Sequence, residues 1–204
     1  MFFVFVDSFL FFLFVWFCWC LCPLVFCVLW KHSGVSLKEK INFFQTLVIS
    51  KLQYGLSTIT LVKAQRRRLD GFYVRCLRKI LRIPAAYYSR ISNQTVLEKA
   101  GQAPFTEQLL YRQFVLLGKI ARSPLNSPLR RDTFVGASVS PMIGHFIRIV
   151  GRPRQDWTNY LLKEGATRLG HEKFQQMLVD RSDGAQQRWI SELQRALKSW
   201  VVVW

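Results

Sequence analysis

The residues best able to do chemistry in this chain are arginines that recur along one segment. Arg68, Arg75 and Arg82 are spaced seven apart, so in a helix they share one face. The band also contains Lys79 and, to its sides, Arg66, Arg67 and Arg78. Guanidinium groups bind phosphate oxygens through paired hydrogen bonds, which suits such a band to a nucleic-acid backbone. A solvated helix face is the simpler interpretation of the same pattern.

The rest of the sequence offers little for catalysis. The histidines His32, His145 and His171 are scattered, and no two acidic residues are adjacent. Asp180 and Asp183 lack the further oxygen ligands of a calcium loop. There is no P-loop, no Gly-rich dinucleotide motif and no nucleophile-elbow motif. We therefore expect no catalytic residue, no metal site, no cofactor and no small-molecule substrate.

The positive charge is concentrated in the part of the chain from Lys31 onward. The 204 residues include 29 Lys and Arg against 12 Asp and Glu, which gives a formal net charge of +17. All of the basic residues lie at or after Lys31. This charge predicts a polyanionic partner, either nucleic acid or an anionic membrane surface. The apolar content of 50% excludes a wholly disordered chain.

Residues 1–30 form an apolar segment with a single charged residue, Asp7. From Ser8 to Trp30 there are 23 uncharged residues, enough for a helix to cross a hydrocarbon layer of ~30 Å. The lysines that follow, beginning with Lys31, would keep the C-terminal part in the cytosol if this segment spans a membrane. The segment is rich in Phe, Trp and Cys and lacks Gly and Ala. Adventitious translation of non-coding sequence is therefore an equal alternative, and a cleaved signal peptide is a weaker one.

Apolar spacing predicts a mainly α fold, a small helical bundle preceded by the apolar segment. Ser36 and Glu39 form a capping box that begins a helix, and Gly55 is expected to close it. The basic helix is expected to bury Leu69 and Leu77 and to end at Pro84. The helices predicted from spacing, caps and breakers cover residues 36–55, 63–83, 92–101, 106–123, 157–169, 174–178 and 185–200, with a short β-branched stretch at 57–62.

These elements divide the chain into four regions. The apolar segment occupies residues 1–30, and a helical domain is expected over residues 31–122. Residues 123–153 are rich in proline and glycine, which predicts a long loop or linker. Residues 154–204 form a C-terminal helical extension.

The order of the motifs resembles the thumb region of non-LTR (LINE-type) retrotransposon reverse transcriptases. The resemblance covers about residues 30–169. The matching positions are Trp30, Lys31, Leu52, Tyr54, Gly55, Lys63, Ala64, Gln65, Arg67, Arg68, Leu69, Phe72, Arg75, Cys76, Leu77, Arg78, Ile80, Leu81, Ile83, Ser89, Arg90, Ile91, Ser92, Asn93, Val96, Leu97, Ala100, Gly101, Leu116, Gly118, Ala121, Arg122, Gly151, Arg152, Pro153, Arg154 and Trp157.

In that family the thumb is a helical domain that grips the template-primer duplex behind a palm whose aspartates bind two metal ions. The resemblance implies that Leu69, Phe72, Cys76 and Leu77 hold the helical bundle together. The palm motif has no counterpart before Trp30, so the resemblance implies a catalytically incomplete fragment and not an enzyme.

We therefore expect a fragment of a retroelement reverse transcriptase that binds the backbone of an RNA or DNA duplex without sequence specificity. The expected contact residues are Arg66, Arg67, Arg68, Arg75, Arg78, Lys79, Arg82, Arg152 and Arg154. Two alternatives stay open: a single-pass membrane protein anchored through residues 8–30 with a cytosolic basic domain, and a decayed retroelement without function. The expected location is a membrane if the apolar segment inserts, and otherwise the nucleus or the cytoplasm.

Overall fold

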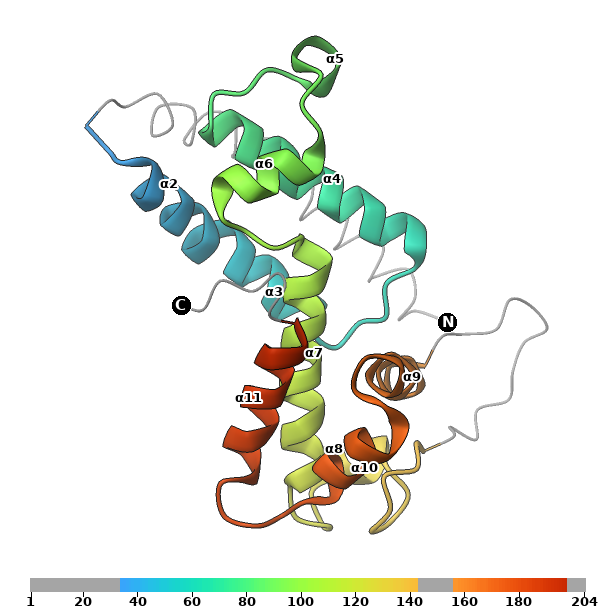
Figure 1. Ribbon diagram of the computed structural model, residues 1–204. Coiled ribbons are helices and arrows are strands. Elements are labelled where there is room, and N and C mark those ends of the chain that lie inside the picture. The colour runs from blue at the N-terminus through green and yellow to red at the C-terminus, as the bar shows by residue number, and fades with distance from the viewer. Residues whose placement is uncertain (1–33, 143–155, 198–204) are drawn as a thin grey trace, which may run out of the picture.

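The computed structural model describes residues 34–142 and 156–197, and in these ranges the chain is mainly helical, as the sequence predicts (Figure 1). The predicted apolar helix of residues 1–30 lies outside the described residues. The elements in chain order are α2 (Leu37–Phe44), the π-helix η1 (Gln45–Ile49), α3 (Ser50–Leu56), α4 (Lys63–Ile80), α5 (Ala86–Ser89), α6 (Asn93–Ala100), α7 (Phe105–Arg122), α8 (Pro128–Thr133), α9 (Trp157–Leu169), α10 (His171–Val179) and α11 (Ala185–Leu197).

The first helical segment begins where its capping box predicts. The Ser36 backbone N–H donates to a Glu39 carboxylate oxygen at 2.8 Å, and the Glu39 N–H donates to the Ser36 hydroxyl at 3.3 Å. Helices α2, η1 and α3 continue into one another through residues in right-handed helical conformation. The segment ends at Leu56 and not at Gly55, because Gly55 keeps the helical conformation. It buries Phe44 and neighbouring apolar residues against the basic helix α4.

Two hydrophobic cores share the long helix α7. The first core contains buried residues of α2, η1, α3, α4, α6 and the start of α7, up to Leu109. The second begins with Leu110 and joins the rest of α7 to α9, α10 and α11. Figure 1 shows α7 running down the molecule, with α2–α6 around its upper end and α8–α11 around its lower part. The border between the cores therefore falls inside α7, and not after residue 122.

The first part of the predicted linker is folded. Pro128 occupies the first turn of α8, where its missing N–H costs no hydrogen bond. Phe134 is only 1% exposed in the second core, and the buried Arg130 guanidinium donates to the carbonyl oxygens of Ala121 and Ala137. Outside α8 the residues of 123–142 have no helix, as a loop predicts, but the packing of Arg130 and Phe134 shows that the stretch is not a free linker. Residues 143–153 lie outside the described part of the chain.

The C-terminal helices pack on α7 through close contacts at a glycine. Gly118 of α7 faces Trp189 of α11, and a Cβ placed there would lie 2.4 Å from the indole Nε1. The buried Trp189 donates from Nε1 to the Phe114 carbonyl at 3.0 Å. This contact requires glycine at position 118, because the indole ring of Trp189 occupies the space that a side chain at this position would fill. The C-terminal extension therefore shares a core with α7.

Among residues 34–142 and 156–197, no helix has both the length and the apolar character that a membrane crossing requires.

Candidate nucleic-acid interface

The basic helix α4 has a well-defined start and one apolar side. The Gln65 side chain accepts a hydrogen bond from the Val62 backbone N–H at 2.9 Å, which satisfies one free donor at the N-terminus. Leu69 and Leu77 are buried, as the spacing predicts, and so is Tyr73, which the sequence analysis missed. The helix is therefore fixed along one side by the first core.

The outer side of α4 carries a row of exposed cations, which we call the α4 basic row: Arg67, Arg68, Arg75 and Lys79. These four residues are among the expected contact residues, and all four are exposed. The basic partners of the ion pairs among the described residues are Arg168 of α9, Lys173 of α10, and Arg188 and Arg195 of α11. None of these ion pairs includes a member of the row. The row therefore presents positive charge that the described carboxylates leave uncompensated.

The acidic residue within α4 points away from the row. Asp70 accepts hydrogen bonds from the Thr106 backbone N–H at 3.0 Å and from the Thr106 hydroxyl at 2.9 Å. It thereby caps the N-terminus of α7, where a carboxylate is favoured by the helix dipole. From Lys63 to Arg90 the sequence contains no other acidic residue. The outer side of α4 therefore keeps its positive charge.

Arg78 is not part of the outer surface, contrary to the expectation. The residue is 5% exposed. Its guanidinium donates to the Pro84 carbonyl at 3.1 Å, the Ser89 hydroxyl at 3.2 Å, the Ile91 carbonyl and the Asn93 side-chain oxygen at 3.3 Å. Four acceptors from the segment after α4 therefore occupy this side chain. The prediction that Arg78 faces a phosphate strand is wrong, because its hydrogen bonds are used within the fold.

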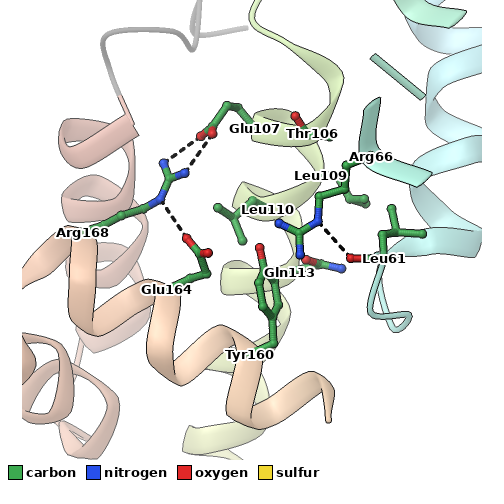
Figure 2. Close-up of a pocket in the computed structure, with 10 residues that line it drawn as sticks. All are labelled: Leu61, Arg66, Thr106, Glu107, Leu109, Leu110, Gln113, Tyr160, Glu164 and Arg168. Atoms are coloured by element: carbon green, nitrogen blue, oxygen red, sulfur yellow. Dashed lines mark hydrogen bonds and ion pairs between the residues drawn. The ribbon is translucent and has the colours of Figure 1, made fainter. Parts of the chain in front are cut away.

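Arg66 also turns inward, toward a small pocket between α4, α7 and α9. Its Nε donates to the Leu61 carbonyl at 3.0 Å, and its guanidinium carbon lies 4.4 Å from the centre of the Tyr160 ring. Figure 2 shows the Arg66 guanidinium between Leu61, Gln113 and Tyr160. Arg66 is therefore half-buried in a contact with the C-terminal extension, and lies apart from the α4 basic row.

The pocket itself, about 120 Å³ in volume, is balanced in charge. Arg168 binds both carboxylate oxygens of Glu107 at 2.8 Å, and its Nε lies 3.6 Å from Glu164 (Figure 2). The hydrogen bonds that Arg168 donates to Glu107 raise the pKa of Arg168, and burial raises the pKa of Tyr160. Two arginines thus face two carboxylates, so the pocket offers no net charge for an ionic ligand.

The remaining predicted contact residues lie beyond α4. Arg82 is exposed and adopts a left-handed conformation with φ of 55° just after the helix. Arg152 and Arg154 lie outside the described residues. Among the residues that the structure describes, no three His, Cys, Asp or Glu side chains gather closely enough to hold a metal ion.

Sequence reasoning also missed two exposed aromatic residues. Tyr87 and Tyr88 of α5 are 87% and 79% exposed, and their ring centres lie 5.4 Å apart. The sequence could have indicated this exposure, because the two tyrosines are adjacent in a segment between Pro84 and Ser92 that is too short to bury both rings.

Comparisons with protein-family models, curated proteins and solved structures gave no match to this chain.

Proposed function

We propose that this chain is a catalytically incomplete fragment of a retroelement reverse transcriptase that binds the backbone of duplex nucleic acid through the α4 basic row. The order of the motifs between Trp30 and Trp157 supports the assignment to the thumb and C-terminal region. Phosphate contact supplies affinity without sequence specificity, because a phosphate is the same beside every base.

The observation that carries the proposal is the exposed row on α4, none of whose members forms an ion pair with a carboxylate of the described residues. Arg67, Arg68, Arg75 and Lys79 are exposed, while Asp70 is turned toward α7. Cations without carboxylate partners need no internal ion pair to break when they meet a phosphate. Arginine is favoured over lysine here, since its planar group binds two phosphate oxygens at once.

The spacing of the row suits a phosphate strand. At a rise of about 1.5 Å per residue, Arg68 and Arg75 are separated by about 10.5 Å along α4, and Arg75 and Lys79 by about 6 Å. One strand of B-form DNA carries one charge per about 3.4 Å of axis. Measured along the duplex axis, these separations correspond to about three and about two phosphate steps of one strand.

A salt titration of duplex binding tests the proposal. Four phosphate contacts predict a slope of log K against log salt of about −3.6, or an affinity loss of about 150-fold between 50 and 200 mM salt. The double variant Arg68→Ala/Arg75→Ala removes two contacts, so the slope should flatten to about −1.8 and the loss to about 12-fold. Fluorescence anisotropy with a labelled DNA duplex and an RNA·DNA hybrid of equal length measures both slopes.

A matched control separates local contact from total charge. Arg131 and Arg181 are exposed arginines outside α4, so Arg131→Ala/Arg181→Ala removes the same charge. The control should keep the wild-type slope. An equal flattening in both double variants, or a wild-type affinity that ignores salt, would contradict binding through the α4 basic row.

A further inference from the structure

The tyrosines of α5 are unusually open to solvent for large aromatic side chains. Tyr87 is 87% exposed and Tyr88 is 79% exposed. Their ring planes meet at 85°, so the pair presents two aromatic faces in different directions. Figure 1 shows α5 projecting beyond α4 and α6, at the end of the molecule away from α8–α10. The rings therefore contribute little to the first core.

The projection that carries these rings is held at its base by the fold. The buried Arg78 donates to acceptors on both sides of α5, at Pro84 before it and at Ile91 and Asn93 after it. The Ser89 hydroxyl is placed to donate to the Pro84 carbonyl at 3.3 Å or to the Ala85 carbonyl at 3.2 Å. The segment is therefore a fixed platform for the two rings.

The chemistry around the platform favours nucleic acid over other partners. Arg82 and Arg90 are exposed and flank α5 in the sequence, and residues 81–93 contain no acidic side chain. Exposed aromatic rings beside cations are the elements with which proteins hold unpaired bases: the rings stack on bases and the cations follow the backbone. The helix α5 carries only Ala and Ser besides the tyrosines, so it offers no large aliphatic side chain to insert into a lipid layer.

We propose that Tyr87 and Tyr88 stack on unpaired bases of a single-stranded extension of the duplex that lies along α4. This inference rests on the proposed function, because the α4 basic row must hold the duplex beside the platform. Stacking does not distinguish among the bases, so the platform would recognise the presence of a single-stranded extension and not its sequence.

The test compares a blunt DNA duplex with the same duplex carrying a six-nucleotide oligothymidine extension, at its 3′ end in one probe and its 5′ end in another. We expect the wild-type chain to bind at least one of the extended probes tenfold or more tightly than the blunt duplex. Tyr87→Ala/Tyr88→Ala should abolish that preference and leave blunt-duplex affinity within twofold. Tyr87→Phe/Tyr88→Phe should retain it, because the rings remain.

A matched control is available on α3. Tyr54 is 86% exposed, so Tyr54→Ala removes an equally exposed ring far from α5 in the sequence and should leave the preference unchanged. A preference that is absent in the wild type, or that survives Tyr87→Ala/Tyr88→Ala, would overturn the inference. So would binding to vesicles of phosphatidylcholine and phosphatidylserine that needs these tyrosines without any preference for an extension.

The two proposals fail in different ways. If Arg68→Ala/Arg75→Ala leaves the salt slope of the blunt duplex unchanged, the proposed function fails. If that slope flattens as expected and the extension has no effect, only the tyrosine platform fails. Equal urea midpoints for the variants would show that the comparison is made between folded proteins.

Discussion

Replacement of Arg78 by alanine should destabilise the fold and leave duplex binding by the folded protein unchanged. Arg78 belongs to the same helix and the same charge class as Arg75, so the sequence gives both the same role. The structure separates them, because Arg75 is exposed while Arg78 is 5% exposed and donates to four acceptors. The variant therefore distinguishes a fold-holding arginine from a ligand-binding one.

The size of the effect follows from the lost hydrogen bonds. A hydrogen bond to a charged group contributes about 1.5–3 kcal/mol net, and the bonds of one guanidinium do not add fully. Alanine also leaves the Pro84 and Ile91 carbonyls without this donor. We expect Arg78→Ala to lower the free energy of unfolding by about 3 kcal/mol, a large part of the ~5–15 kcal/mol of a typical domain.

Urea unfolding followed by circular dichroism measures this loss. With an m-value of about 2 kcal/mol/M, the midpoint should fall by about 1.5 M. Arg78→Lys should lose most of the same stability, because a compact ammonium cannot reach acceptors spread from Pro84 to Asn93. Arg75→Ala is the matched control and should stay within about 0.5 kcal/mol of the wild type. A wild-type midpoint for Arg78→Ala, together with a flattened salt slope, would refute this assignment.

Two further predictions concern packing and pH. Gly118→Ala should lower the free energy of unfolding by about 1–3 kcal/mol, because the new Cβ would meet the Trp189 ring. Gly71→Ala in α4, where nothing lies within 4 Å of the new Cβ, should raise the free energy of unfolding by about 0.5–1 kcal/mol. Urea midpoints that move in the same direction for both variants would contradict this. Burial raises the pKa of Tyr73 from 10.0 to about 12, so the folded state keeps the proton that the unfolded chain releases. Stability is therefore fully present below pH 10 and should fall by about 2–3 kcal/mol as pH rises from 10 to 12, and Tyr73→Phe should remove this part of the loss.

The local elements were predictable because their signals are local. The capping box at Ser36 and the Gly101 stop, with φ of 62°, lie where the sequence places them. The helix α7 ends before Ser123, as expected. Caps and glycine stops act within one turn of chain, so neighbouring residues carry enough information to place them.

The division into domains depends on contacts that no local signal contains. Proline and glycine after residue 123 predict a break, but Arg130 and Phe134 place that stretch in the second core. The match between Gly118 and Trp189 joins residues 71 positions apart in the sequence. The proline and glycine content therefore predicts where helices end, but it does not predict which helices share a hydrophobic core.

The arginines show why periodicity alone gave an incomplete site. A seven-residue repeat identifies a face, but the buried sector of α4 includes Tyr73 and Val74 and is wider than the apolar spacing suggested. Arg78 lies one turn after Val74, so it falls inside that sector. The charge of Arg78 is stabilised there by carbonyl oxygens and not by a carboxylate. Its hydrogen bonds therefore hold the segment around α5 in place, and its positive charge is not neutralised.

This arrangement has a consequence for the surface field. Arg78 and Arg130 are buried and donate to carbonyl oxygens, so neither uses an acidic residue. Charge that is not neutralised inside the fold still contributes to the potential outside it. The inward arginines therefore strengthen the attraction of a polyanion to the molecule as a whole, while the α4 basic row determines where the backbone lies. The buried arginines thus add to the long-range attraction, and the α4 basic row makes the local contacts with phosphates. The salt slope should therefore change when an exposed arginine of α4 is removed, because a local contact is lost.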